Sequence, residues 1–228
     1  MLRVQCAGKF EFVVEDGSFV FLIGTNGSGK TTLLKNISGA IRPAFYRVEI
    51  DGIDVSNLSA SEMVRKGVVL VPEGKANFPE LTVDENLRLG AYIAGVPKSR
   101  RGELFDFIYS LFPSLKDRKR QIARVLSGGE QRMLAIARGL AADPKILLLD
   151  EPSLGLAPKA IETIYSSLVK IKETGKTIII AEQGISAVLS FRDFVDEVYF
   201  MSEHQITFRG DVGEIESVDE IRKVYFGV

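Results

Sequence analysis

Residues 24–31, which read Gly-Thr-Asn-Gly-Ser-Gly-Lys-Thr, constrain the fold of this chain more than any other stretch. They fit the phosphate-binding loop pattern G-x-x-x-x-G-K-[ST]. The apolar run 18–23 before the loop has the length of a β-strand, and Leu33, Leu34 and Ile37 after it fall at helical spacing. In this arrangement, backbone N–H groups of the loop and of the helix N-terminus bind phosphate. The stretch therefore predicts a nucleotide-binding α/β protein.

The residue types in this loop suit contact with a nucleotide. Glycine at 27 and 29 permits backbone angles and close approaches that a Cβ atom would oppose. Lys30 is expected to reach the β- and γ-phosphates, and the Thr31 hydroxyl is expected to bind Mg²⁺. The predicted nucleotide contacts are Asn26, Gly27, Ser28, Gly29, Lys30, Thr31 and Thr32. The alternative is a glycine-rich turn with an incidental lysine, which the flanking strand and helix disfavour.

Composition narrows the class of protein. The chain has 228 residues, 46% of them apolar, and a net charge of −1. This mixture suits one globular unit without a general attraction for nucleic acid or anionic membranes. Cys6 is the only cysteine, so no internal disulfide can form and a reducing compartment is expected. No apolar run approaches the ~20 residues of a membrane span, and there is no signal-peptide pattern. A cytosolic protein able to dock onto a membrane partner is expected.

Hydrophobic patterning predicts alternating strands and helices. Strands are expected near 9–14, 47–50, 67–71, 146–152, 177–181, 198–201 and 205–208, and helices near 59–65, 82–94, 101–112, 127–142, 159–173 and 214–225. The early strands suggest an antiparallel sheet. The later alternation predicts a largely parallel sheet, with ligands at the carboxyl ends of its strands. Between about 72 and 123, helix formers replace strand patterns, which indicates an inserted helical subdomain.

Basic residues gather in that helical stretch, at 98–101 and 116–120. Aromatic residues are not interleaved with them, and the chain as a whole is not basic. A solvated face explains them better than a nucleic-acid surface does.

Two carboxylates end a buried apolar strand at Asp150 and Glu151. In a protein with a phosphate-binding loop, the aspartate at this position assists Mg²⁺. A glutamate next to it can polarise an attacking water. Successive strand residues point to opposite faces, so the two carboxylates need not share a role. The alternative is a strand that simply ends in acidic residues.

Residues 126–131, Leu-Ser-Gly-Gly-Glu-Gln, open the predicted helix at 127–142. Ser127 and Glu130 form the S-x-x-E pattern of a capping box, which needs no ligand. Gly128 and Gly129, however, each weaken a helix start by roughly 1 kcal/mol. Unhindered backbone N–H groups that bind phosphate would justify them. Two phosphate-binding helix starts suggest a dimer that holds ATP between the loop of one chain and Ser-Gly-Gly of the other.

Together these motifs resemble the ABC ATPases. The phosphate-binding loop at 24–31, LSGGEQ at 126–131 and the acidic strand end at 146–151 occur in that family's order and spacing over nearly the whole chain. Further segments are similar to the ATPases of branched-chain amino-acid importers. They are VPEGK at 71–75, EPSLGLAP at 151–158 with Ala157 in place of aspartate, AEQ at 181–183 with Gln183 in place of histidine, and FPSL at 112–115.

The resemblance implies a fold. A single ABC ATPase domain over 1–228 would have a RecA-like α/β core, a small antiparallel β subdomain and an inserted helical subdomain at 73–125. It implies ATP and Mg²⁺ as cofactors, with Thr31 and Asp150 as the metal ligands.

The resemblance also implies roles for site residues. Glu151 would be the general base or water-positioning residue, and Gln183 would contact the γ-phosphate. Glu73 would lie where the nucleotide site meets the surface that couples to the membrane subunits. Ser127, Gly128 and Gly129 would bind the nucleotide of the opposite chain.

The function implied is that of an ATP-hydrolysing motor subunit of an importer, with branched-chain amino acids as the cargo. Its partners would be transmembrane permease subunits, a second ATPase chain, identical or paralogous, and indirectly a substrate-binding protein, but not nucleic acid. The expected location is peripheral, on the cytoplasmic face of the cell membrane.

Two other functions remain open from the sequence. A soluble ABC protein that acts on nucleic acid or ribosomes usually has paired ATPase domains or long coiled-coil inserts, and neither is visible here. An ATP-gated clamp with little hydrolysis is suggested by Gln183, whereas Glu151 speaks against it.

One departure from the family concerns adenine. ABC ATPases usually stack adenine on an aromatic residue well before the phosphate-binding loop, but only 23 residues precede Gly24. The opening strand and loop are therefore expected to be truncated. Phe10 and Phe12 alternate with Glu11, which favours core positions over an adenine contact. His204, the only histidine, is expected to be a solvated turn residue.

Overall fold

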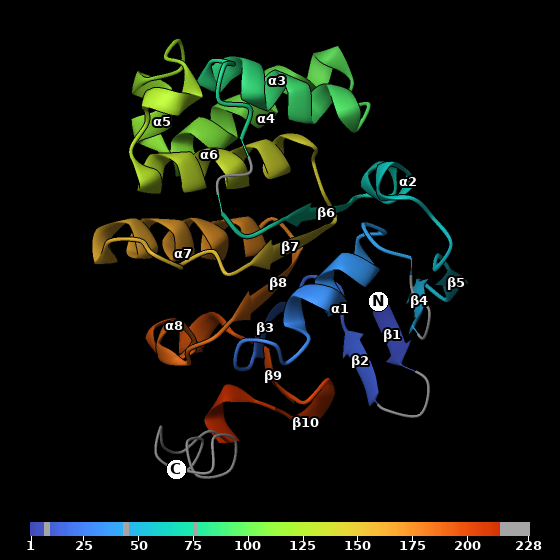
Figure 1. Cartoon of the computed structure of the whole chain (residues 1–228). Coiled ribbons are helices and arrows are strands. Elements are labelled where there is room, and N and C mark those ends of the chain that lie inside the picture. Colours follow the sequence, from blue (N-terminus) through green and yellow to red (C-terminus); the bar gives the residue numbers. More distant parts are fainter. Residues whose placement is uncertain (7–9, 43–45, 75–76, 215–228) are drawn as a thin grey trace.

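The computed structural model of the chain describes residues 1–6, 10–42, 46–74 and 77–214 (Figure 1). Lys9, Lys75 and the part of the predicted C-terminal helix from residue 215 onward lie outside the described residues. The expected α/β architecture is confirmed: a mixed sheet with helices on both faces stands beside a small antiparallel sheet.

The larger sheet has six strands in the order β10-β9-β3-β8-β7-β6. Their bounds are β3 Phe19–Ile23, β6 Val68–Val71, β7 Ile146–Asp150, β8 Thr177–Glu182, β9 Glu197–Ser202 and β10 Gln205–Gly210. All neighbours are parallel except β9 and β10, which form the predicted hairpin. Every residue of β3, β7 and β8 is buried, as expected for strands covered on both faces.

The smaller sheet has the order β2-β1-β4-β5 and is antiparallel throughout. Its strands are β1 Leu2–Cys6, β2 Phe10–Val14, β4 Tyr46–Ile50 and β5 Ile53–Asp54. The expectation of a truncated opening strand is wrong, because β1 pairs along its whole length with both β2 and β4. Leu2, Val4 and Cys6 are buried in β1 and alternate with the less buried Arg3 and Gln5.

The helices are α1 Lys30–Ile37, α2 Ala60–Arg65, α3 Val83–Ile93, α4 Lys98–Leu111, α5 Pro113–Asp117, α6 Gly128–Ala141, α7 Pro158–Lys172 and α8 Ser186–Ser190, with 3-10 turns η1 Ala123–Val125, η2 Arg192–Phe194 and η3 Val212–Glu214. No helix within the described ranges has the length and apolar character needed to cross a membrane. In Figure 1, α3, α4, α5 and α6 form a helical layer at the top of the view, and the four-stranded sheet lies at the right.

Two hydrophobic clusters divide the faces of the larger sheet. Leu33 and Leu34 of α1 pack with Leu148 of β7 on one face. Leu147 and Leu149 of β7 pack on the other face, in a cluster that also contains residues of α6, α7 and the helices between 83 and 117. Helices α1 and α6 therefore cover opposite faces of the sheet. The carboxyl ends of β3, β7 and β8 meet at one edge, where such sheets bind ligands.

Candidate active site

The phosphate-binding loop leaves β3 and enters α1 at Lys30. Gly27 and Gly29 adopt φ angles of 80° and 107°, the left-handed region that favours glycine. A Cβ atom at Gly24 would lie 2.3 Å from the Met201 carbonyl oxygen, so that position also requires glycine. The loop is thus shaped by glycines and held against β9.

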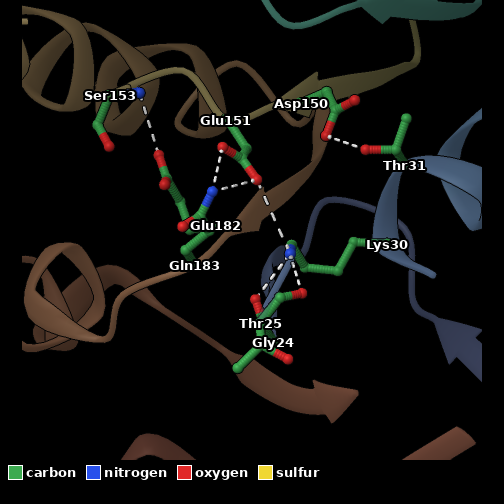
Figure 2. A network of polar contacts seen from close by, with 9 residues as sticks. All are labelled: Gly24, Thr25, Lys30, Thr31, Asp150, Glu151, Ser153, Glu182 and Gln183. Atoms are coloured by element: carbon green, nitrogen blue, oxygen red, sulfur yellow. Dashed lines mark hydrogen bonds and ion pairs between the residues drawn. The ribbon is translucent and has the colours of Figure 1, made fainter. Parts of the chain in front are cut away.

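Lys30 is buried, with its ammonium among oxygen atoms. Nζ donates hydrogen bonds to the carbonyl oxygens of Gly24, at 2.7 Å, and Thr25, at 3.1 Å. It also lies 3.8 Å from a carboxylate oxygen of Glu151 (Figure 2). Burial lowers the pKa of Lys30, and the carboxylates of Glu151 and Asp150 oppose this shift. The cation is held by acceptors that phosphate oxygens could replace.

Asp150 ends β7 beside the start of α1. The Thr31 hydroxyl donates a hydrogen bond to its carboxylate at 3.1 Å (Figure 2). Burial raises the pKa of Asp150; the Thr31 hydrogen bond opposes this shift, and the neighbouring Glu151 adds to it. The two predicted metal ligands are therefore in direct contact.

Glu151 follows Asp150 in a conformation unusual for a residue with a side chain. Its φ is 44°, and such left-handed residues are concentrated at functional sites. The side-chain nitrogen of Gln183 donates to both carboxylate oxygens, at 2.9 and 3.1 Å (Figure 2). The structure thus brings the predicted catalytic pair together across the ends of β7 and β8, although 32 residues separate them in the sequence.

Glu182, the last residue of β8, is buried and sequence analysis did not single it out. Its carboxylate accepts hydrogen bonds from the Ser153 backbone N–H, at 3.1 Å, and from the Tyr165 hydroxyl, at 2.8 Å. Burial is the main cause of the raised pKa of Tyr165, and Glu182 adds to it. Glu182 thereby fixes the segment that follows Glu151.

A pocket of about 600 Å³ opens at this edge of the sheet. It is lined by Asn26, Gly27, Gly29, Lys30, Thr31, Thr32, Glu73, Glu151, Leu154, Gln183 and His204. Nine of these residues were predicted from sequence, and Leu154 and His204 were missed. Ser28 is buried within the loop, and its hydroxyl has no hydrogen-bond partner among the described residues. An unpartnered hydroxyl in the loop suits a site that a ligand completes.

His204 is exposed in the turn between β9 and β10, as predicted, but it also borders the pocket. Its backbone N–H donates to the Ser28 carbonyl oxygen at 3.0 Å. A Cβ atom at Gly29 would lie 2.8 Å from the His204 imidazole. This contact depends on the pairing of β9 with β3, and no local pattern in the sequence signals that pairing.

The Ser127 motif forms the predicted capping box. The Ser127 hydroxyl accepts from the Glu130 N–H at 3.3 Å, and the Glu130 carboxylate accepts from the Ser127 N–H at 2.9 Å. Ser127, Gly128 and Gly129 are absent from the pocket lining. They begin α6, which lies across the sheet from α1. The motif therefore does not complete the pocket of its own chain.

The charges at this edge suit a divalent cation. Five charged side chains are buried among the described residues, namely Lys30, Arg132, Asp150, Glu151 and Glu182. Two cations thus face three carboxylates. No group of three His, Cys, Asp or Glu residues in the described part could hold a metal. Mg²⁺ needs no such cage where it binds phosphate with one or two protein oxygens, and Thr31 and Asp150 fit that demand.

The aromatic residues near the N-terminus do not line the pocket. Phe12 is fully buried against Tyr199, with ring centroids 4.6 Å apart, and Phe10 is partly buried beside Tyr46. Phe12 is a core residue, as predicted. Of the described lining residues, only His204 has a ring.

Comparison with known proteins places these features in context. The ABC transporter family model matches residues 8–154. The high-affinity branched-chain amino acid transport ATP-binding protein BraG of Pseudomonas aeruginosa is 36% identical over 225 residues, covering 99% of this chain and 94% of BraG. The probable branched-chain amino acid transport ATP-binding protein LivF of Archaeoglobus fulgidus is 32% identical, covering 94% of this chain and 89% of LivF. A crystal structure of the ADP conformation of an ATP-binding cassette of an ABC transporter aligns over 100% of this chain and 98% of its own, with 27% identity and a TM-score of 0.84.

Proposed function

This chain belongs to the ABC transporter ATP-binding proteins, and from that membership we propose that it hydrolyses ATP to drive import of branched-chain amino acids through permease subunits. The observation that carries the hydrolytic part is the contact of Gln183 with Glu151 at the rim of the phosphate-binding pocket. A carboxylate held at that point can accept a proton from a water that attacks the γ-phosphate.

The chemistry proposed assigns one task to each residue. Glu151 takes the proton of the attacking water, and Gln183 orients the Glu151 carboxylate. Lys30 exchanges the carbonyl oxygens of the loop for phosphate oxygens. Thr31 and Asp150 would hold Mg²⁺, which when bound neutralises charge on the phosphates. The loop N–H groups stabilise the charge that remains.

A second ATPase chain, identical or paralogous, is part of this proposal. Ser127, Gly128 and Gly129 lie away from the pocket of their own chain, and residues 127 and 128 are exposed. Ser127 and Glu130 bond each other in the capping box, and the N–H groups of Gly128 and Gly129 at the helix start suit the phosphates of a nucleotide held by the partner. The site would then be complete only when two chains close on ATP.

An apolar groove supports docking of a permease. It lies between α2, β6, α3 and α6 and is lined mainly by apolar side chains, among them Val69, Phe78 and Ile93. Phe78 and Ile93 are 43% and 49% exposed, and exposed apolar residues gathered at a groove mark interaction sites. Val71 lines this groove, whereas Glu73 lines the nucleotide pocket. The segment 71–74 thus connects the two, which suits transmission between ATP and a membrane partner.

The proposed cargo and the proposed location rest on sequence similarity to known transport proteins. Both named relatives are described as branched-chain amino acid transport proteins, and the segments VPEG, EPSLGLAP and AEQ are similar to that branch. Through the permease, the chain would lie on the cytoplasmic face of the membrane, with a substrate-binding protein acting on the other side.

The groove is tested by exchanging one exposed isoleucine for lysine. Ile93→Lys should abolish co-purification with membrane subunits while ATP hydrolysis by the isolated chain persists, because only the docking surface becomes charged. Ile53→Lys is the matched control, since Ile53 is 60% exposed on β5 in the other sheet. Uptake of labelled leucine by cells would be lost with Ile93→Lys alone. Equal co-purification of both variants would show that the permease does not bind this groove.

A further inference from the structure

Arg132 is a buried arginine directly behind the site, in the second turn of α6. One terminal nitrogen donates to the carbonyl oxygens of Pro72, at 2.6 Å, and Gly74, at 3.1 Å. The other donates to the carbonyl oxygen of Asp150 at 2.6 Å. Its guanidinium therefore joins the backbone on both sides of Glu73 to the backbone at the predicted metal ligand.

Buried carboxylates balance the charge of Arg132. Burial lowers the pKa of Arg132, and the negative charges of Glu182, Asp150 and Glu73 oppose this shift. Arginine nevertheless stays protonated in proteins, so its charge and its planar set of donors are permanent. Glu182 is also the residue that holds Ser153 and Tyr165. Arg132 and Glu182 are thus two opposite buried charges behind the pocket.

Arg132 lies on the same helix, α6, that begins with the Ser127 motif. The helix begins at Ser127-Gly128-Gly129, which on the proposed function faces the nucleotide of the partner chain. Five residues later, Arg132 holds Asp150, next to Glu151, and the segment of Glu73 in its own chain. A rigid helix thus links the contact with one nucleotide to the geometry of the other site.

We propose that Arg132 is a positioning residue for ATP hydrolysis, which fixes the Asp150–Glu151 strand end relative to the Glu73 segment. This inference rests on the proposed hydrolytic role of Glu151. A shift of a catalytic group by about 1 Å can reduce turnover by about 10²-fold. Loss of the three hydrogen bonds should therefore lower turnover far more than it lowers ATP affinity.

The test compares Arg132→Gln, Glu182→Gln and the double variant. Either single change leaves the opposite buried charge less compensated and should lower the melting temperature. The double variant removes both charges and should regain thermal stability. Its turnover should nevertheless stay about 10- to 100-fold below wild type, with the Kd of ATP unchanged within about threefold. Glu182→Gln should be less impaired, because the amide oxygen can still accept from Ser153 and Tyr165.

Lys176→Gln is the matched control. Its ammonium bonds the Asp143 carboxylate and the Pro144 carbonyl oxygen, each at 2.8 Å, just before β8 begins. That end of the strand is opposite Glu182 and the pocket. The control should turn over like wild type.

Recovery of turnover together with stability in the double variant would overturn the proposal, because Arg132 would then serve charge balance alone. Wild-type turnover of a stable Arg132→Gln chain would overturn it as well. Glu151→Gln, measured in parallel, separates this result from the proposed function. If Glu151→Gln is inactive while the double variant is fully active, only the role of Arg132 is wrong.

Discussion

At the scale of single residues, the site combines features that oppose folding. Burial keeps Lys30 and Asp150 away from water, which lowers the pKa of Lys30 and raises the pKa of Asp150. Both shifts favour the uncharged form of the side chain. Glu151 adopts a left-handed backbone conformation at the same place. A nucleotide and a metal ion would compensate these charges, so the site lowers the stability of the fold in favour of ligand binding. Such sites are where a substitution can stabilise a fold and destroy its function.

Asp150→Asn is a substitution that we expect to stabilise the fold and to destroy its function. The folded chain holds the Asp150 proton more tightly than the unfolded chain, whose carboxyl has a pKa of about 3.9. Wild-type stability contributed by this group therefore falls as pH rises from about 4 through the raised pKa of the folded state. Asparagine removes this loss. We expect a melting temperature a few degrees above wild type at pH 7, together with loss of Mg²⁺-dependent ATP hydrolysis.

Thermal unfolding of the wild type and of Asp150→Asn at pH 4 and pH 7 tests whether the wild type loses stability as the pH rises. The advantage of Asp150→Asn should be larger at pH 7 than at pH 4. An advantage that shrinks as pH rises would mean that Asp150 is stabilised as a carboxylate in the fold, contrary to its buried environment.

Gln183 offers a second test at this scale. Its amide holds both oxygens of Glu151, so Gln183→Ala should reduce turnover by about 10²-fold, the loss typical of one preorganised donor. Gln183→His should retain much of the activity, since histidine can also donate a hydrogen bond. A new pH dependence between about 6 and 7 should accompany it, because histidine titrates there. Steady-state hydrolysis against pH distinguishes the variants; wild-type rates for Gln183→Ala would remove Gln183 from the mechanism.

At the scale of elements, sequence patterns located most strands and helices, because burial on both faces leaves continuous apolar runs in β3, β7 and β8. The capping box of α6 and the phosphate-binding loop were also legible, since each is a local motif. Several features were missed, including the short helices α5 and α8. The strand β1 was missed because it has only three inward-facing residues, too few for a clear pattern. The contact of His204 with the phosphate-binding loop and the hydrogen bonds of Arg132 were missed because each joins residues that are distant in the sequence. The limits 73–125 for an inserted helical subdomain remain a prediction.

Two hairpin turns in the described part of the chain differ in backbone strain. Asp51 and Gly52 link β4 to β5 with φ angles of 53° and 76°, and Glu203 and His204 link β9 to β10 with 48° and 61°. Asp-Gly is a preferred pair for such turns, but Glu and His carry Cβ atoms that oppose these angles. His204→Gly should raise the stability of the chain by up to about 1 kcal/mol, because relief of the left-handed strain, roughly 1–2 kcal/mol, is partly offset by the greater freedom of glycine in the unfolded chain.

Urea unfolding measures this gain, and Gln205→Gly is its control, because Gln205 lies outside the turn in β10. The backbone N–H of residue 204 that bonds Ser28 remains in the variant. A destabilised His204→Gly chain would show that the imidazole contributes more through its contact with the loop than it costs in the turn.

At the scale of the whole molecule, the two predicted phosphate-binding helix starts cannot serve one nucleotide within one chain. Helix α1 covers one face of the sheet and α6 the other, and the pocket lacks the Ser127 motif among its described lining residues. Two chains arranged head to tail would bring the motif of each to the pocket of the other. Arg132 would then connect each nucleotide to the neighbouring site.

Complementation tests this arrangement. Lys30→Ala and Ser127→Arg should each be inactive alone, but a mixture should recover part of the activity, since one of the two sites in a mixed dimer is intact. Ser59→Arg is the matched control, because Ser59, like Ser127, is the N-cap residue of a capping box, in this case at the start of α2. It should remain active by itself. Mixtures that dimerise and stay inactive would contradict a shared site.

We expect this chain to hydrolyse ATP with Glu151 as the base, in a site closed by a second chain. Glu151→Gln tests this expectation, since glutamine keeps the size of the side chain and one of the two oxygens that accept from Gln183 but removes its basicity. The measurement is light scattering with and without Mg-ATP, combined with phosphate release from the same sample. We predict that the variant binds ATP, doubles its mass in an ATP-dependent manner and releases no phosphate. Phosphate release within a few-fold of wild type would show that Glu151 is not the base, and a chain that stays monomeric with ATP bound would show that a second chain does not close the site.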